Sequence, residues 1–562
     1  MKIAVFQNNT TVGAVQTNAD HVIRCAQRAE ALGADLALFP ELSIPGYPPW
    51  DLLERPSFID ACADVEARIA AEVPPSLTVI FGNVRRRPIP PTFGRALQNV
   101  ATVVANGRVQ DHVVKSLLPT YDVFDEARFF EPARDQKPLI LNVGGRKVGI
   151  TICEDIWNDD QLWATEDLWR DKSAGGHRLY AHDPVQDIAA AGADVIVNLS
   201  ASPWARGKRA VRDRVLRHLC RRYGVWVAYA NHIGANDGLL FDGHSVVHNP
   251  EGHCVAQGPC WTNGELVVDL DAAPTEDMTV AEEGITAIRD ALSMGIADYF
   301  RKTGFETAVI GLSGGIDSAV TAYLAVHALG AQNVIGVGMP SEYSSEHSVA
   351  DARSLAENLG IRFHLVPIAS TFNAYREALA PAFAGYAEDI TEENLQSRVR
   401  GGLLMAMANK FNAIVLSTGN KSEAATGYAT LYGDTVGALC VLADLYKHQV
   451  YAVARLANEE RPTIPVSSIE KPPSAELRPG QQDTDSLPPY EQLDRMLELL
   501  IEHRASATQI AKEVGVSLST AQDIIRKVYR NEFKRRQLPP TLRVSRKSWT
   551  GRIYPIVQGF SE

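Results

Sequence analysis

The chain has 562 residues, of which 45% are hydrophobic and 22% are charged, and its formal net charge at pH 7 is −12. This is an ordinary globular composition with enough length for two or more hydrophobic cores, and the acidic balance argues against bulk binding to nucleic acid. The sequence has no apolar run of the ~18 residues that cross a membrane and does not start with a basic segment followed by an apolar one. We therefore expect a cytoplasmic protein with neither a membrane nor a nucleic acid as partner.

Three short apolar segments in the first third of the chain each predict a buried strand that ends at a chemically active residue. The segments end at Glu41, Lys115 and Cys153, and strand ends are where α/β proteins build active sites. A thiol attacks only as thiolate, so Cys153 needs a base, which Glu41 can provide. A Lys115 ammonium would stabilise the charge that attack on a carboxamide places on oxygen. Each residue also fits a structural role, as a strand cap, an edge charge or a core thiol.

The sequences around these three residues are FPELSIPGY, VVKSLLPTY and TICEDIW. They resemble the signature stretches of the carbon–nitrogen hydrolase (nitrilase) superfamily over about residues 1–270. The resemblance implies an α-β-β-α sandwich with a Glu-Lys-Cys catalytic triad at these positions. In nitrilase-like glutaminases the matching positions hold glutamine, so it also implies Tyr121, Ser202 and Lys208 as glutamine contacts. The stretch 158–187 is longer than the usual spacer, and we expect a surface insertion there.

Residues 271–284 are small and acidic, which predicts a linker between this domain and a second one over 285–562. The second domain begins with an amphipathic helix, after which buried strands alternate with helices. Such alternation predicts a doubly wound parallel sheet.

A glycine-rich turn, Ser313 to Ser318, joins the first strand of this domain to an apolar helix. Adjacent glycines let backbone N–H groups approach a phosphate, and the helix N-terminus adds positive potential. A carboxylate beside phosphates requires a divalent cation between them, so we expect Asp317 to bind Mg²⁺. The turn lacks the lysine of the usual P-loop and resembles the SGGxDS loop of the ATP pyrophosphatase family. That resemblance implies ATP as co-substrate, bound by Gly311, Leu312, Ser313, Gly314, Gly315, Ile316, Asp317 and Ser318.

Four further stretches occur in order around this loop: MPSEYSS (339–345), ENLQSRVRGG (393–402), STGNKSE (417–423) and LYGDTVGAL (431–439). Together they resemble the NAD synthetase family, which adenylates the nicotinate carboxylate of nicotinic acid adenine dinucleotide and replaces AMP with ammonia. The resemblance implies that Thr418 binds ATP, that Glu423 binds Mg²⁺ or the dinucleotide, and that a homo-oligomer forms. It places these residues at the dinucleotide: Asn394, Arg398, Asp444, Lys447 and Lys534.

The two resemblances together imply glutamine-dependent amidation of that dinucleotide. A carboxylate becomes a good acyl donor only when ATP has converted it to an adenylate, and a glutaminase half supplies ammonia in its reactive, unprotonated form. The substrates would be glutamine, ATP and nicotinic acid adenine dinucleotide.

Three alternatives stay open from the residues. Another pyrophosphate-loop amidotransferase would act on a nucleobase, an amino acid or a tRNA base. The segment 505–526 has the helix, glycine turn and second helix of a helix-turn-helix, with basic residues after it, as in a DNA-binding regulator. The overall acidity argues against that interpretation. The third alternative is a hydrolase half that has lost its activity and serves only as a scaffold, and the intact Glu41, Lys115 and Cys153 argue against it.

Overall fold

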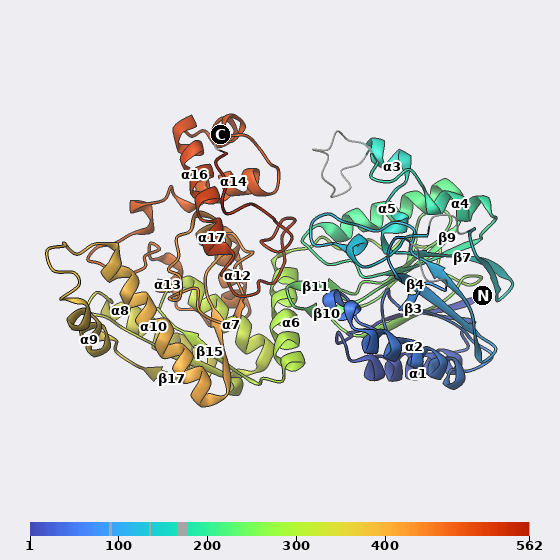
Figure 1. The fold of residues 1–562 in the computed structure, drawn as a ribbon, viewed down its shortest axis with the longest axis horizontal. Coiled ribbons are helices and arrows are strands. Elements are labelled where there is room, and N and C mark those ends of the chain that lie inside the picture. Colours follow the sequence, from blue (N-terminus) through green and yellow to red (C-terminus); the bar gives the residue numbers. More distant parts are fainter. Residues whose placement is uncertain (89–92, 134–136, 166–177, 561–562) are drawn as a thin grey trace. The chain divides into compact units, whose positions relative to one another are not determined.

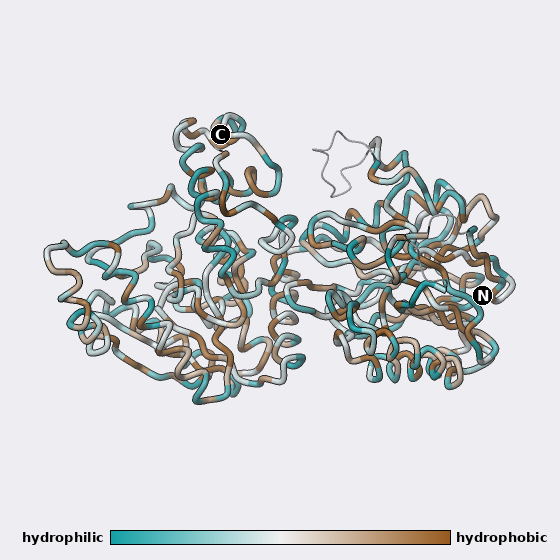
Figure 2. The backbone as a smooth tube through the Cα atoms, in the orientation of Figure 1, coloured by the Kyte–Doolittle hydropathy of each residue, from teal (hydrophilic) through white to brown (hydrophobic). Residues whose placement is uncertain are grey.

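The computed structural model describes all residues except 89–92, 134–136, 166–177 and 561–562. The chain forms two compact units, Met1–Glu282 and Glu283–Glu562 (Figure 1). Figure 2 shows that hydrophobic residues are concentrated along the strands inside each unit. Part of the expected insertion at 158–187 lies outside the described residues, and its described part includes the short helix α3 (Asp160–Thr165).

The first unit contains two six-stranded sheets. One has the order β14-β1-β2-β3-β4-β5 and the other β13-β12-β9-β8-β7-β6. Strands β1, β2 and β3 run parallel, as do β7, β8 and β9. The bounds in the first sheet are β1 (Lys2–Gln7), β2 (Leu36–Leu38), β3 (Thr78–Arg86), β4 (Leu97–Ala105), β5 (Arg108–Val114) and β14 (Gly264–Asp269). Those in the second are β6 (Ile140–Val143), β7 (Arg146–Ile152), β8 (Val195–Ser200), β9 (Trp226–Asn231), β12 (Val246–His248) and β13 (Cys254–Gln257). A separate hairpin is formed by β10 (Ile233–Asn236) and β11 (Leu239–Asp242).

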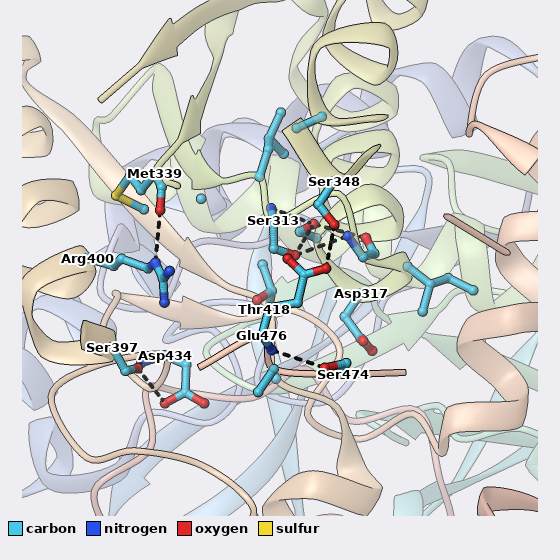
Figure 3. A pocket seen from close by; sticks show the side chains of 18 of the residues that line it. Ser313, Asp317, Met339, Ser348, Ser397, Arg400, Thr418, Asp434, Ser474 and Glu476 are labelled. Carbon is cyan, nitrogen blue, oxygen red and sulfur yellow. Dashed lines mark hydrogen bonds between the residues drawn. The ribbon is translucent and has the colours of Figure 1, made fainter. Parts of the chain in front are cut away.

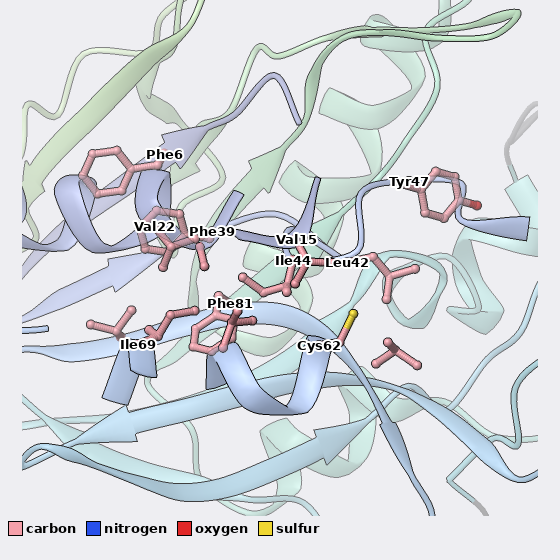
Figure 4. Close-up of a cluster of buried hydrophobic side chains, with 14 of the residues drawn as sticks. Phe6, Val15, Val22, Phe39, Leu42, Ile44, Tyr47, Cys62, Ile69 and Phe81 are labelled. Carbon is pink, nitrogen blue, oxygen red and sulfur yellow. The ribbon is translucent and has the colours of Figure 1, made fainter. Parts of the chain in front are cut away.

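Successive side chains along each strand point to opposite faces of the sheet, and this alternation explains the layers of this unit. In β1, Ile3 and Val5 belong to the core between the two sheets, whereas Ala4 and Phe6 belong to the core under helices α1 (Val15–Ala31) and α2 (Pro56–Glu72). Figure 4 shows Phe6 in that second core, together with Phe39, Phe81 and Val22. Helices α4 (Pro184–Ala190) and α5 (Lys208–Tyr223) cover the second sheet in the same way. The expected α-β-β-α sandwich is therefore confirmed.

The second unit is built on a five-stranded parallel sheet of order β17-β16-β15-β18-β19. The strand order reverses between β15 and β18, which is where doubly wound sheets bind ligands. Helix α10 (Ile390–Phe411) packs on one face of the sheet, against Val309, Ile335 and Val415. Ala308 and Ile310 alternate with Val309 and are also buried, as expected for a sheet covered on both faces. The strands are β15 (Thr307–Gly311), β16 (Val334–Gly338), β17 (Arg362–Leu365), β18 (Ala413–Ser417) and β19 (Leu439–Cys440).

Helices complete this unit. Together with α10, the helices between the strands are α7 (Ile316–Leu329), α8 (Glu346–Leu359), α9 (Ala369–Leu379) and α11 (Lys421–Thr426). Helix α6 (Ile285–Thr303) precedes β15, and α12 (Lys447–Glu460) and α13 (Val466–Glu470) follow β19. A C-terminal group consists of α14 (Tyr490–Ile501), α15 (Ala507–Val514), α16 (Leu518–Arg530) and α17 (Glu532–Arg535). The pair that resembles a helix-turn-helix, α15 and α16, packs its apolar face into a core shared with α14 and Ala425 of α11. Within the described residues, no helix combines the length and apolar character needed to cross a membrane.

Gly82 in β3 provides a test of how the first unit positions Glu41. A Cβ atom at Gly82 would lie 2.1 Å from the backbone N of Leu42 and 2.5 Å from the carbonyl carbon of Glu41. We expect Gly82→Ala to lower the free energy of unfolding by about 1–3 kcal/mol, because the turn that carries Glu41 must move. Chemical denaturation of the variant measures this loss.

The matched control is Gly402→Ala, in the interior of α10, where an added Cβ meets no atom within 4 Å. This change should stabilise the protein by about 0.5–1 kcal/mol, because alanine loses less backbone entropy in a helix than glycine does. Equal effects of the two substitutions would contradict the close approach at Gly82.

Candidate active sites

The structure brings Glu41, Lys115 and Cys153 together in the first unit. Glu41 follows β2, Lys115 follows β5 and Cys153 follows β7, and all three side chains are buried. The Lys115 Nζ donates a hydrogen bond to Glu41 Oε1 over 2.7 Å. Glu41 Oε2 accepts one from the backbone N of Ala201 over 3.0 Å, which fixes the orientation of the carboxylate. Lys115 and Glu41 are thus joined directly, and Cys153 lies close enough for both to shift its pKa.

Cys153 occupies a strained turn between the end of β7 and a short 3₁₀ segment. Its φ of 46° lies in the left-handed region that L-residues rarely adopt, a feature common at functional sites. Burial raises the pKa of the Cys153 thiol well above its ordinary value, Glu41 raises it further and Lys115 opposes the rise. The resting thiol is therefore protonated at neutral pH, and a base must take its proton during attack.

A second carboxylate, Glu126, completes the surroundings of Lys115. Lys115 Nζ donates to Glu126 Oε1 over 2.9 Å and to Oε2 over 2.8 Å, and the Tyr47 hydroxyl donates to Oε1 over 3.2 Å. Burial alone would lower the pKa of Lys115, but Glu126 and Glu41 outweigh it and hold that pKa well above its ordinary range. Glu126 was not predicted from the sequence, because it lies in a turn eleven positions after Lys115 and no periodic pattern links the two residues.

Asp155 ties two of the catalytic segments together and was also missed. Its Oδ1 accepts hydrogen bonds from the backbone N of Ser116 and of Leu117, over 3.1 and 2.9 Å, directly after Lys115. Its Oδ2 accepts one from the backbone N of Ile152, over 2.9 Å, directly before Cys153. One buried side chain therefore sets the spacing between the lysine and the nucleophile.

The predicted glutamine contacts lie around this cluster. The Tyr121 hydroxyl donates to Glu154 Oε2 over 2.9 Å, which places it beside the residue that follows Cys153. Ser202 is buried next to Ala201, whose N–H binds Glu41. Lys208 donates from Nζ to the Pro203 carbonyl over 3.0 Å. The three residues flank the triad, and their contact with glutamine stays a prediction.

The second unit contains a cavity of about 310 Å³ at the carboxyl ends of β15, β16 and β18 (Figure 3). Most of the predicted ATP-binding residues line it: Gly311, Leu312, Ser313, Gly315, Ile316, Asp317, Ser318 and Thr418. Gly314 is not in the lining but is required for the turn, because its φ is 78° and a Cβ there would lie 2.3 Å from the carbonyl oxygen of Ser348. Glu423 and Lys447 also line the cavity.

Asp317 and Glu423, the two predicted metal ligands, face the same ammonium group. Lys447 Nζ lies 2.6 Å from Asp317 Oδ2 and 3.4 Å from Glu423 Oε1. Burial and the neighbouring Asp317 raise the pKa of Glu423 to about 8, and Lys447 opposes this rise. No group of three or more metal-binding side chains occurs among the described residues. Two carboxylates nevertheless fit Mg²⁺, which proteins commonly bind through one or two carboxylates together with substrate phosphates.

Three of the residues assigned to the dinucleotide contact one segment, 427–431. Asn394 Oδ1 accepts from the Thr430 hydroxyl over 2.8 Å, and Arg398 Nε donates to the Leu431 carbonyl over 3.2 Å. Lys534 Nζ donates to the carbonyls of Gly427 and Ala429, over 2.7 Å each. Because Tyr428 and Thr430 line the cavity, these residues support its wall.

The structure does not bring Asp444, also assigned to the dinucleotide, into the cavity lining. Asp444 is buried, and it accepts hydrogen bonds from the backbone N of Val544 and of Ser545 over 2.8 and 2.7 Å. It also lies 3.0 Å from the ammonium of Lys421. These contacts make Asp444 an anchor for the C-terminal segment.

The proline-rich segment that follows α13 contributes another wall, which the sequence alone did not assign. Residues 471–477 line the cavity. Within them, Glu476 Oε1 accepts hydrogen bonds from the hydroxyls of Ser345 and Ser348 over 3.2 and 2.7 Å (Figure 3). The segment is therefore ordered against α8 at the edge of the cavity.

Comparisons with known proteins agree with the two units. The Carbon-nitrogen hydrolase family matches residues 2–167 and 179–279, and the NAD synthase family matches residues 288–539. The glutamine-dependent NAD(+) synthetase of Synechocystis sp. is 42% identical over 570 residues, which cover 99% of each chain. The enzyme of that name from Thermotoga maritima is 38% identical over 100% of this chain and 99% of its own.

A solved structure is similar over the same extent. The glutamine-dependent NAD+ synthetase from Acinetobacter baumannii, determined in complex with ADP, is 35% identical, with a TM-score of 0.75 and coverage of 99% of this chain and 98% of its own. Family matches in both units and relatives of matching length lead to one assignment. The chain belongs to the glutamine-dependent NAD(+) synthetase family.

Proposed function

We propose that this chain makes NAD from nicotinic acid adenine dinucleotide, ATP and glutamine, with AMP, pyrophosphate and glutamate as the other products. The observation that carries the proposal is that one chain holds both reaction centres. Lys115 joins Glu41 and Glu126 beside Cys153 in the first unit, and the Ser313–Ser318 loop borders a nucleotide-sized cavity in the second. We further propose, from family resemblance, that the chain acts as a homo-oligomer.

The first unit hydrolyses glutamine. The Cys153 sulfur attacks the carboxamide carbon while its proton passes to Glu41, and the ammonium of Lys115 stabilises the negative oxygen. Glu41 then gives the proton to the leaving nitrogen, the C–N bond breaks, and ammonia departs to leave a thioester on Cys153. Water, deprotonated by Glu41, cleaves the thioester to glutamate and restores the thiol. We assign the binding of the glutamine backbone groups to Tyr121, Ser202 and Lys208.

The second unit activates the dinucleotide. A nicotinate carboxylate oxygen bonds to the α-phosphorus of ATP, the bond from that phosphorus to pyrophosphate breaks, and an acyl-adenylate forms. Ammonia then attacks the acyl carbon, AMP leaves, and the amide of NAD results. Mg²⁺ held by Asp317 and Glu423 would offset the negative charge of the phosphates. Backbone N–H groups of the loop and the hydroxyls of Ser313 and Ser318 bind the pyrophosphate part of ATP.

Cys153→Ala separates the two reactions. We expect glutamine-driven NAD formation to fall by about 10³-fold or more, because the nucleophile is gone, while ammonium-driven formation stays near the parent rate. NAD is measured with each nitrogen source in turn. Loss of both activities in a folded variant, or retention of the glutamine-driven one, would contradict the assignment.

Glu126→Gln tests the second carboxylate. Burial raises the pKa of Glu126 to about 7, with Lys115 opposing the rise. A protonated Glu126 accepts weaker hydrogen bonds from the Lys115 ammonium, so glutamine hydrolysis by the parent should fall as the pH drops through about 7. The variant should lack this acid limb and hydrolyse glutamine about 10- to 100-fold more slowly, the loss expected for one charge-assisted hydrogen bond.

The control for Glu126→Gln is Asp125→Asn, an exposed neighbour whose side chain caps no helix. It should leave both the rate and the pH profile of glutamine hydrolysis unchanged. A parent-like acid limb in Glu126→Gln would show that another group is responsible for it.

Asp317→Asn tests the metal assignment. In the presence of ATP, we expect Mn²⁺ to bind at least about tenfold more weakly, because one charged ligand is lost. Electron paramagnetic resonance of free Mn²⁺ measures this affinity directly, and glutamine hydrolysis should be unaffected. Glu357→Gln, an exposed acid on α8 outside the cavity lining, serves as control. Equal Mn²⁺ affinity in both variants would remove Asp317 from the metal site.

A further inference from the structure

Arg400 is a cation in the nucleotide cavity, and within the described part of the chain it has no acidic partner. It lies on α10, and its side chain lines the cavity beside Met339 (Figure 3). Its Nε donates a hydrogen bond to the Met339 carbonyl over 3.0 Å. Among the residues that the structure describes, no carboxylate forms an ion pair with its guanidinium.

The other cations of the cavity lining differ from Arg400 in this respect. Lys447 lies between Asp317 and Glu423, and Lys471 lies 3.5 Å from Asp351. Burial lowers the pKa of Arg400 to about 10, with only Glu476 acting against this shift. The Glu476 carboxylate is bound instead by Ser345 and Ser348. A desolvated charge without a counterion is unfavourable, and so the cavity is arranged for an anion at this point.

The position of Arg400 indicates which anion binds beside it. Leu404 lies one turn further along the same face of α10, and its Cδ1 lies 3.2 Å from the point where a Cβ of Gly311 would be, next to the phosphate loop. Apolar side chains at the ends of β16 and β17, Met339, Phe363 and Leu365, line the neighbouring part of the cavity and suit a planar base. With adenine there and pyrophosphate on the Ser313–Ser318 loop, the α-phosphate of ATP would lie between the two. Helix α10 spans the same interval, from Arg400 at the Met339 carbonyl to Leu404 at Gly311.

We propose that Arg400 binds the α-phosphate of ATP and, after adenylation, the same phosphate in the acyl-adenylate and in AMP. This inference rests on the proposed function. A guanidinium can form two parallel N–H···O bonds to a phosphate from one rigid plane, a fixed geometry that the ammonium of a lysine does not offer. The α-phosphate takes part in both chemical steps, first as the centre attacked and then as part of the leaving group. Arg400 therefore holds it in place through both.

The test compares Arg400→Met and Arg400→Lys with Lys410→Met, which removes an exposed charge from the same helix outside the cavity. Titration calorimetry gives the dissociation constants of ATP, AMP, pyrophosphate and nicotinic acid adenine dinucleotide for each full-length chain. For Arg400→Met we expect about 10- to 100-fold weaker binding of ATP and AMP, with pyrophosphate and the dinucleotide unchanged. Arg400→Lys should recover part of the loss, and Lys410→Met should match the parent.

Glu476→Gln, alone and combined with Arg400→Met, distinguishes two roles of Arg400. Arg400 either contacts a phosphate or acts by contacting the 471–477 segment. The loss of AMP affinity on removing Arg400 should be the same with or without the Glu476 charge. If the loss disappears in the Glu476→Gln background, Arg400 acts through that segment and the proposal is wrong. It is also wrong if Arg400→Met binds AMP as tightly as Lys410→Met, or if only dinucleotide binding weakens.

Failure of the proposed NAD synthesis would give a result that differs from failure of the Arg400 proposal. A parent chain that binds ATP and AMP but forms no NAD with ammonium would contradict the proposed synthesis, while the calorimetric comparison would still decide the role of Arg400. Unchanged binding of pyrophosphate and of the dinucleotide confirms that the second unit of each variant is folded.

Discussion

The glutaminase centre depends on one buried ammonium shared between two carboxylates. Glu41 lies 74 positions before Lys115 and Glu126 lies eleven after it, and each charge would be strongly disfavoured in the interior alone. Together they satisfy one another with hydrogen bonds of 2.7–2.9 Å. The core between the two sheets fixes the positions of the strand ends, so the charged groups stay within hydrogen-bonding distance of one another. The cluster therefore requires the complete sandwich, and removing one member leaves an uncompensated buried charge.

The synthetase centre repeats this arrangement with a different purpose. Lys447 again lies between two carboxylates, Asp317 and Glu423, at the ends of neighbouring strands β15 and β18. Here the charges face a cavity, so a divalent cation and phosphates can join the network. Arg400 is left over when these pairs are counted, and a phosphate would supply the negative charge that balances it. Charge balance thus distinguishes cations that are paired with carboxylates of the protein from a cation that is paired only when an anionic ligand binds.

The sequence predicted the parts of both sites that lie at strand ends within recognisable local patterns. Glu41, Lys115, Cys153 and the Ser313–Ser318 loop each follow an apolar strand, and strand ends meet because the sheet aligns them. Glu126 and Asp155 were missed because their partners are fixed by packing between distant segments. Asp444 shows that a local pattern can also mislead. It lies three positions before Lys447 and was assigned to the dinucleotide by resemblance, but its carboxylate accepts hydrogen bonds from the C-terminal segment and lies outside the cavity lining. The role of residues 471–477 also depended on tertiary contacts, here with α8.

The electrostatics of the first unit also decide the form in which nitrogen is released. In the proposed mechanism, Glu41 takes the proton of Cys153 and returns it to the leaving nitrogen, so the net charge of the centre is the same before and after the thioester forms. Lys115 is the other proton donor in contact with Glu41, but its two carboxylates hold its pKa well above the ordinary range. It therefore keeps its proton and does not convert ammonia to ammonium. Because only the neutral molecule has the lone pair that attacks an acyl-adenylate, the Glu126 carboxylate contributes to amidation as well as to glutamine hydrolysis.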